Sequence, residues 1–480
     1  MQEADYREIK GKIVSGVFAL TSRTVVLQVV SFFSTFILTI LLSPSIFGVF
    51  FVVSAVISFL SYFSDIGFAA ALVQKKEEPT RAEYVTSFTI QQILVGSIVI
   101  ISIFLSPVFS SFYNLGSDGL LLLRALLASF FLSSLKTIPS IILERKLDFQ
   151  LLIIPQILET VVFYLLAIIL ALLGWGITSF AWAAVARGIV GLVAIYMISP
   201  WKVGIGISFT ALRHLLAFGI PFQTNSILAL VKDDLMTIFL GKILPFSQVG
   251  YIGWAKKWAE APLRLIMDSI VRVTFPAYSR LQSDSKVLGR AIEKSFFFLA
   301  FFIFPVTALM IIFIKPLIQI IPKYTKWEPA LISFYLFSFA VIFAAFSSPI
   351  VNALNATGRI KTTLVLMVVW TILTWMLVPA LTVTFGYNGV AEGAFIISFT
   401  GVLPIIIMKK IVNFRIIHVL YKPLVATLFT SVAVFFVLQF ANNLPGVIIA
   451  AVSAAVIYGL FAWIWMKTDI LPYLPKFRSR

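Results

Sequence analysis

Fourteen mostly apolar stretches, each long enough to cross a lipid bilayer, constrain this chain more than any other feature of its sequence. A transmembrane helix needs about 20 such residues. The stretches run at about 13–41, 46–73, 85–112, 119–142, 151–173, 180–198, 214–241, 249–276, 295–314, 330–354, 362–385, 388–408, 423–440 and 445–466. Their connections are short, and the longest outer one, 315–329, has about fifteen residues. The sequence therefore predicts an all-α polytopic membrane protein with about 14 transmembrane helices.

The composition agrees with a membrane protein and argues against most enzyme chemistry. Hydrophobic residues make up 60% of the chain and charged residues 12%, whereas a soluble domain carries roughly 25% charged residues. The chain has no cysteine and two histidines, and no phosphate-binding loop or serine nucleophile elbow is visible. We therefore expect no enzyme, no cofactor and no metal site. The net charge of +17 lies on a charge-poor chain, so we expect no nucleic-acid partner.

The basic residues between the stretches fall almost entirely on one side of the membrane. Even-numbered loops and both termini hold 24 of them, and odd-numbered loops hold four. Basic loops stay in the cytoplasm. The sequence therefore predicts a multi-pass protein of the cell inner membrane with both termini in the cytoplasm.

The two halves of the chain contain a weak internal repeat. Residues 42–50 align with 244–252 at an offset of about 202. The alternative is chance, because small residues are common between membrane helices. If the repeat is real, residues 1–205 form an N-lobe of six helices, 206–422 form a C-lobe of six, and 423–480 add helices 13 and 14 with a cytoplasmic tail.

Sixteen charged residues lie inside the predicted spans. They are Arg23, Asp65, Arg124, Lys136, Glu159, Arg187, Lys232, Asp233, Asp234, Lys256, Lys257, Glu260, Arg264, Asp268, Arg272 and Glu392. Each costs about 2.5–3.5 kcal/mol at the centre of a membrane helix when it faces lipid. We therefore expect most of them to face protein or water.

The predicted eighth helix, 249–276, carries a one-sided series of charges. Lys257, Glu260, Arg264, Asp268 and Arg272 follow one another at spacings of three or four residues, which places them on a single face. One interpretation is a ladder of ion pairs that locks the helix to a neighbour. The other, which we favour, is the wet wall of a central cavity in which the cations bind substrate.

Aromatic residues gather near the outer end of the same helix. Tyr251, Trp254 and Trp258 lie within two turns of one another. They could stack on sugar rings of a substrate, or they could form an aromatic belt at the membrane interface.

Two arginines and one glutamine in the first six helices are further candidates for binding a substrate. Arg23 lies near a stripe of polar residues on the first helix that includes Gln28, and Arg187 lies within the sixth span. We expect Arg23, Gln28 and Arg187 to face a substrate cavity. Arg124 and Lys136 lie closer to the ends of the fourth span, where a long side chain can instead reach the interface.

Four carboxylates are candidates for an ion-coupling site or for the cavity wall. Asp233 and Asp234 follow Lys232 directly, so no single helix face holds all three, and at least one acid is expected to pair with a cation. The repeat places Asp65 opposite Asp268. The intramembrane charges of the first six helices sum to +2, and those of the next six cancel to zero. A cavity between the two groups would therefore be net positive.

Three segments resemble a known transporter family. They are Phe63-Ser64-Asp65-Ile66-Gly67-Phe68 running on to Leu72–Glu77, Leu143-Glu144-Arg145-Lys146-Leu147-Asp148-Phe149, and Gly250-Tyr251 with Pro262 and Val273–Asp284. Together they resemble the polysaccharide-transporter (Wzx-type) flippases of the multidrug/oligosaccharidyl-lipid/polysaccharide exporter superfamily, close to the colanic-acid exporter group. The resemblance covers most of residues 11–422 and is weakest in the last two helices.

This resemblance implies two six-helix lobes arranged as a V. It also implies a substrate in which a membrane lipid is joined to a sugar. Family members move undecaprenyl-diphosphate-linked oligosaccharides from the cytoplasmic to the periplasmic leaflet by alternating access, for surface polysaccharide synthesis. Related lipid-II flippases use a cavity arginine in the first helix, a role that Arg23 would take here. The resemblance also suggests polysaccharide polymerase machinery as a partner, and we expect a monomer.

Two other classes of function remain as alternatives. An ion-coupled multidrug or cation antiporter of the same superfamily would need fewer cavity cations and a dominant acidic site. A membrane enzyme that polymerises or ligates glycans would normally need a sizeable outer loop with catalytic residues, and the short loops argue against it.

Overall fold

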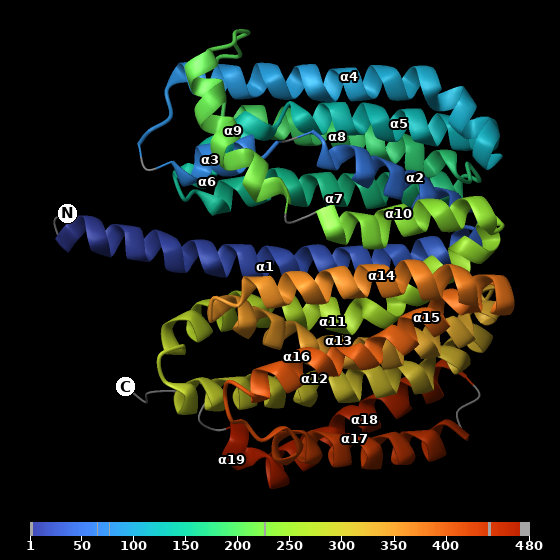
Figure 1. Ribbon diagram of the computed structural model, residues 1–480. Helices are drawn as coiled ribbons and strands as arrows, with labels where there is room; N and C mark the ends of the chain where they lie inside the picture. The colour runs from blue at the N-terminus through green and yellow to red at the C-terminus, as the bar shows by residue number, and fades with distance from the viewer. Residues whose placement is uncertain (1–2, 65, 76, 225–226, 440–442, 471–480) are drawn as a thin grey trace. The chain divides into compact units, whose positions relative to one another are not determined.

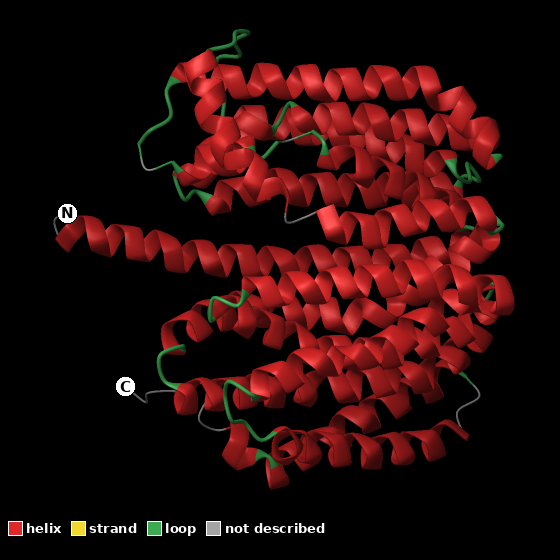
Figure 2. Ribbon diagram, viewed as in Figure 1, coloured by secondary structure: helices red, strands yellow, loops and turns green. Residues whose placement is uncertain are grey.

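The computed structural model describes residues 3–64, 66–75, 77–224, 227–439 and 443–470. Within these ranges the chain consists of helices joined by turns and short loops, with no β-strand (Figure 2). The all-α prediction is therefore confirmed. The contacts divide the chain into two units, Met1–Gly250 and Tyr251–Arg480, and the division falls in the first turns of helix α11.

In its described ranges the first unit contains ten complete helices (Figure 1). They are α1 (Glu3–Leu41), α2 (Pro44–Tyr62), α3 (Phe68–Gln74), α4 (Arg81–Tyr113), α5 (Gly116–Ser134), α6 (Thr137–Arg145), α7 (Phe149–Leu172), α8 (Thr178–Ile198), α9 (Phe209–Thr224) and α10 (Ile227–Ile243). Helix α7 packs against α8 and α1, α8 also packs against α5, and α10 packs against α2.

The second unit contains the rest of α11 (Phe246–Leu281) and the C-terminal half of the chain. Its elements are α12 (Ser285–Ile320), the 3₁₀ turn η1 (Thr325–Ala330), α13 (Leu331–Ala356), α14 (Ile360–Phe385), α15 (Asn388–Ser398), η2 (Phe399–Gly401), α16 (Val402–Lys409), α17 (Ile416–Gln439), α18 (Leu444–Trp465) and α19 (Lys467–Ile470). Helices α17 and α18 pack on α12, and the Tyr458 hydroxyl donates a hydrogen bond to the Phe301 carbonyl at 2.8 Å.

Twelve segments of the described chain are long and apolar enough to cross a membrane, and each corresponds to one of the predicted spans. The other two predicted spans, 214–241 and 249–276, correspond to α9 with α10 and to α11. The chain is therefore a multi-pass membrane protein.

Four spans that the sequence predicts as single helices consist of shorter ones. The span 46–73 holds α2 and α3, 119–142 holds α5 and α6, 214–241 holds α9 and α10, and 388–408 holds α15, η2 and α16. Pro139 and Pro404 lie in the first turns of α6 and α16. Proline has no N–H to donate and its ring clashes with the carbonyl four residues earlier, which favours a break before it.

Two of the segments that carry the family resemblance hold each other in place. The guanidinium of Arg145, at the end of α6, donates hydrogen bonds to the carbonyls of Leu72 and Lys75, the second at 2.9 Å, and to that of Glu77 at 2.9 Å. These bonds satisfy carbonyls at and beyond the C-terminal end of α3, which has no further turn to accept them. The ammonium of Lys75 in turn pairs with Glu83 at 2.7 Å. The described contacts of Arg145 are therefore those of a cap on the α3 loop.

The internal repeat has a counterpart in the packing of the first unit. Helix α2 begins at Pro44 and α11 at Phe246, an offset of 202. Gly48 lies against the backbone of Phe246, and Gly250 lies against the backbone of Pro44. The two contacts are reciprocal at the same offset, as expected for two copies of one motif, and they favour the repeat over chance. The lobe boundaries proposed from the repeat stay a prediction.

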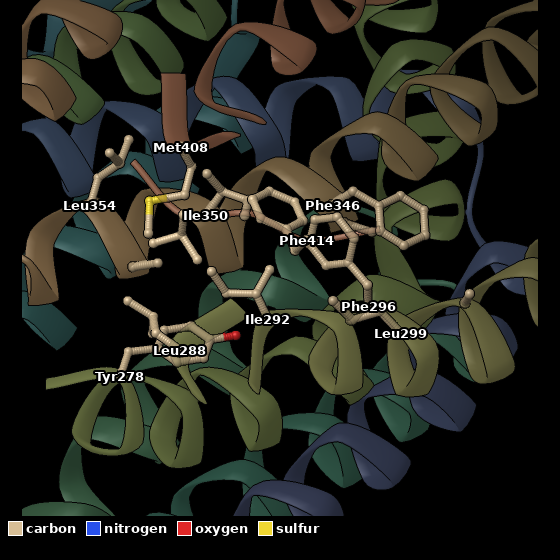
Figure 3. Packing of buried hydrophobic residues seen from close by; sticks show 14 of the residues in the cluster. Tyr278, Leu288, Ile292, Phe296, Leu299, Phe346, Ile350, Leu354, Met408 and Phe414 are labelled. Atoms are coloured by element: carbon tan, nitrogen blue, oxygen red, sulfur yellow. The ribbon is translucent and has the colours of Figure 1, made fainter. Parts of the chain in front are cut away.

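The hydrophobic core of the second unit forms where α12 faces α13 and the segment after α16 (Figure 3). The ring of Phe296 lies with its centroid 5.3 Å from that of Phe346 and 6.1 Å from that of Phe414. Edge-to-face contacts of this kind add to the free energy of apolar burial.

The reciprocal glycine contact makes a testable statement about stability. We expect Gly48→Ala and Gly250→Ala each to destabilise the protein by about 1–3 kcal/mol, because the new Cβ would overlap a backbone carbonyl oxygen that cannot rotate away. Thermal unfolding in detergent measures the effect. Gly96→Ala, in α4, is the matched control, because no atom lies within 4 Å of its Cβ position. Equal melting temperatures for all three variants would contradict the close crossing.

Candidate functional site

A cavity of about 300 Å³ opens inside the first unit among α1, α7, α8 and the start of α6. It is lined by Arg23, Leu27, Lys136, Ser140, Leu152, Pro155, Gln156, Glu159, Thr160, Arg187 and Ile195. All of these residues belong to one compact unit, so the cavity is a property of that unit alone.

Helix α7 supplies the largest share of the cavity wall. Its lining residues are Leu152, Pro155, Gln156, Glu159 and Thr160, which recur at spacings of three and four. This spacing keeps them on one face of the helix. The Thr160 hydroxyl donates to the Gln156 carbonyl at 2.9 Å within the helix, whereas the side-chain oxygen of Gln156 is buried and accepts no hydrogen bond from the described residues. The Gln156 side chain therefore brings a buried acceptor without a described partner to the cavity wall.

The break between α5 and α6 brings Lys136 to the cavity. Lys136 is the residue that precedes α6, and its ammonium donates to Glu159 Oε1 at 2.6 Å. The two side chains are only 15% and 10% exposed. Water screens the attraction in a shielded pair less than in a surface pair, and the partners of so short a contact hold each other in position.

A second cation faces the other oxygen of the same carboxylate. The Nε of Arg187, on α8, lies 3.6 Å from Glu159 Oε2, which is beyond hydrogen-bond distance. The Arg187 side chain is half-exposed, and its Cζ lies 6.0 Å from the centre of the Phe163 ring. Its guanidinium is therefore held loosely and can still offer donors to an anion.

Gly191 makes the position of Glu159 possible. It lies one turn after Arg187 on α8, and a Cβ at this position would overlap Glu159 Oε1. The carboxylate therefore occupies space that the side chain of any larger residue at position 191 would fill.

Arg23 completes the charged part of the cavity from α1. A hydrogen bond of 2.6 Å between the hydroxyls of Ser31 and Tyr164 ties α1 to α7 two turns further along. The described residues that line the cavity then include three cations, Arg23, Lys136 and Arg187, against one carboxylate, a net charge of +2. Guanidinium and ammonium groups in a partly dry pocket bind phosphate or carboxylate oxygens strongly. The arrangement suits an anionic ligand.

The structure gathers some of the predicted substrate residues here. Arg23 and Arg187 line the cavity together, whereas Gln28 does not line it. Sequence reasoning missed Lys136, which it allowed to reach the interface, and Glu159, which it counted only as an intramembrane acid. The spacing of Glu159 with Pro155 and Gln156 on one face of α7, and of Gly191 with Arg187, were the available signals.

The remaining predicted cations lie on α11. Arg264 is 63% exposed and donates to Glu260 at 2.8 Å, and Lys256 lies 4.0 Å from the same carboxylate. Lys257 is half-buried on the same helix. The Glu260–Arg264 pair is one rung of the expected ladder, whereas Lys256 was not part of it. The role of Lys257 and Arg264 in binding stays a prediction. The side chains of Asp268 and Arg272 lie outside the described residues.

The predicted ion-coupling carboxylates have fewer described contacts than the charged residues of the cavity. Asp233 pairs with Lys232 at 3.0 Å and is half-exposed, and Asp234 lies beside it on α10. Asp65 lies outside the described residues. A coupling role for these residues stays a prediction.

Neither interpretation of the outer tryptophans is correct. Trp254 and Trp258 are 1% and 6% exposed, so they can neither stack on a sugar nor lie at the lipid interface. The Trp254 ring stacks on Trp327 at 5.3 Å, and its Nε1 donates to the Tyr324 hydroxyl at 3.1 Å. These rings belong to the interior of the second unit because the turn after α12 folds back over them.

The ion pair of Lys136 and Glu159 can be tested by its effect on stability. We expect Lys136→Met to lower the free energy of unfolding by roughly 1–3 kcal/mol, because the shielded Glu159 keeps only the looser Arg187. Adding Glu159→Gln should restore part of the loss, as thermal unfolding would measure. Lys202→Met, at an exposed lysine, is the control. Additive effects of the two changes would show that the pair is not coupled.

A family model described as "Polysaccharide biosynthesis protein" matches residues 37–331. This range contains Lys136, Glu159 and Arg187 and excludes Arg23. The lipopolysaccharide biosynthesis protein WzxC of Escherichia coli (strain K12) is 22% identical over 465 residues, which cover 95% of this chain and 90% of that protein. The succinoglycan biosynthesis transport protein ExoT of Rhizobium meliloti (strain 1021) is 22% identical over 259 residues, 54% of this chain and 52% of ExoT. The match thus spans about half of ExoT.

Solved structures share the fold. The lipid II flippase MurJ in an inward closed conformation superimposes with a TM-score of 0.72 at 17% identity, covering 93% of this chain and all of MurJ. An inward-facing multidrug resistance MATE family transporter of the MOP superfamily superimposes with a TM-score of 0.61 at 16% identity, covering 80% of this chain and 95% of that one. At these identities the likeness describes the fold alone.

Proposed function

The chain belongs to the polysaccharide biosynthesis protein family, and from this membership and its cavity we propose that it is a flippase for a lipid-linked oligosaccharide. The proposed substrate is an oligosaccharide joined through diphosphate to a polyprenyl lipid. The lipid that we propose is undecaprenyl. The proposed direction is from the cytoplasmic to the outer leaflet of the inner membrane, by alternating access, for the synthesis of a surface polysaccharide.

The observation that carries this proposal is the charge of the cavity. Three cations and one carboxylate surround about 300 Å³ inside a membrane-spanning unit. A diphosphate ester is the part of a lipid-linked sugar that resists crossing a bilayer most, because charge is costly in hydrocarbon. Guanidinium and ammonium groups replace the water that the phosphates lose. Polar groups such as the Gln156 amide are suited to the first sugar.

The same charge argues against the alternative of a cation antiporter. A cationic drug would meet a net charge of +2, and like charges in a partly dry site repel strongly. The fold is shared with a multidrug transporter, but fold alone does not assign the substrate. The proposal also includes polysaccharide polymerase machinery as a partner and a monomeric state.

Export in cells tests the substrate role of the cavity. We expect Arg23→Ala and Arg187→Ala each to reduce surface polysaccharide at least tenfold and to cause the lipid-linked precursor to accumulate, because each removes a phosphate donor. Lipid extraction and glycan analysis measure both quantities, and immunoblots of membranes check abundance. Arg124→Ala is the matched control, since Arg124 is also an intramembrane arginine but donates to Ser106 away from the cavity. Wild-type export in both cavity variants would overturn the proposed function.

The proposed orientation can be tested on single cysteines, because the chain contains none of its own. We expect a membrane-impermeant maleimide to label Ser117→Cys in spheroplasts and to label Gln282→Cys only after the membrane is permeabilised. Both positions are exposed loop or helix-end residues. The opposite pattern of labelling would place the termini outside the cytoplasm.

A further inference from the structure

We propose that Glu159 is a built-in competitor of the transported anion, which lowers the affinity of the cavity so that the substrate can leave. This inference rests on the proposed function, because it assumes that the cavity holds the diphosphate of a lipid-linked sugar. In this role, Glu159 sets the affinity of the cationic cavity for its anionic ligand.

The geometry of the carboxylate supports this role. Oε1 accepts from Lys136 at 2.6 Å, while Oε2 lies 3.6 Å from Arg187 Nε. Each oxygen thus faces a different cation. The tight contact keeps Glu159 in place, and the loose one leaves the guanidinium of Arg187 able to turn to another anion.

The position of Glu159 is prepared by the backbone of α8. Gly191 is the residue whose missing side chain admits the carboxylate, and it lies one turn from Arg187. The atom nearest the empty Cβ position is Oε1, which accepts from Lys136, so this space serves the lysine pair. With Oε1 held there, Oε2 of the same carboxylate lies 3.6 Å from the Nε of Arg187 on the same helix.

The charge of the cavity indicates why an acid belongs in an anion site. A diphosphate that is esterified at both ends keeps one negative charge on each phosphate. With Glu159 ionised, the three cations leave a net charge of +2, which matches such a ligand. Without Glu159 the cavity would hold one excess positive charge, and the ligand would be bound more tightly in every state of the transporter.

Two cations lie against Glu159, and a third lines the same cavity. Lys136 precedes α6, Arg187 lies on α8, and Arg23 lines the cavity from α1. When the ligand is present, Arg187 turns to a phosphate while Lys136 keeps Glu159. When the ligand leaves, Arg187 returns to Glu159, so that its charge is again compensated.

A purely structural ion pair would behave differently on substitution. If Glu159 only held Lys136 in place, its removal would disturb the site and weaken the binding of an anion. If Glu159 competes with the ligand, its removal strengthens binding and slows release, which lowers KM and kcat together.

The test measures binding and flipping by Glu159→Gln. The probe is farnesyl-diphosphate-linked N-acetylglucosamine, a short diphosphate diester, with a fluorescent analogue for flipping in proteoliposomes. We expect the Kd of the variant to fall roughly fivefold to tenfold and its flipping rate to fall by a similar factor. Glu78→Gln, which removes the same charge from an exposed loop, should match the wild type in both.

A second pair of variants separates an effect on binding from a loss of folded protein. In the Lys136→Met background no lysine loses its partner when Glu159→Gln is added, and the added change should again lower Kd by several fold. Unchanged or weaker binding on removal of Glu159 in both backgrounds overturns the inference. If the wild-type protein does not bind the diester at all, the proposed function fails instead, so the two failures are distinguishable.

Discussion

A charge inside a membrane must be compensated by protein or by water, and the first unit meets this constraint around Glu159. The carboxylate holds Lys136 at 2.6 Å and faces Arg187 at 3.6 Å, and Arg23 lines the same cavity. Helix α7, which carries Glu159, packs against both α1 and α8, which carry Arg23 and Arg187. The packing of the first unit and its net positive cavity are therefore two aspects of one arrangement.

The sequence predicted the class of fold because apolar length is a strong signal. Every span found in the structure by length and composition lies where an apolar stretch was expected. It did not predict that four spans would be divided, because hydropathy does not distinguish one helix from two that follow each other. Pro139 was visible in the sequence, but proline is also accommodated within α7 and α11, so its presence alone did not decide the matter.

The site was predictable to the extent that single residues revealed it. Arg23 and Arg187 were expected in a cavity because an arginine within a span has few other places to go. Lys136 was judged by its distance from the end of a span, and the break before α6 made that distance irrelevant. The predictions for the tryptophans on α11 were wrong for a related reason, because the turn that buries Trp254 is remote in sequence. Contacts between distant segments, rather than patterns within one helix, decided these cases.

A carrier has to release what it binds, and this requirement explains an acid among cations. Each tenfold gain in affinity adds about 1.4 kcal/mol to the free energy needed for release. After release, three cations in a partly dry cavity would repel one another and lack counter-charge. In the proposed mechanism, Glu159 reduces both problems, because it competes with the anion for Arg187 and cancels one of the three positive charges when the anion has gone. By the same proposal, a cavity built only from arginine and lysine would bind a diphosphate more firmly and release it more slowly.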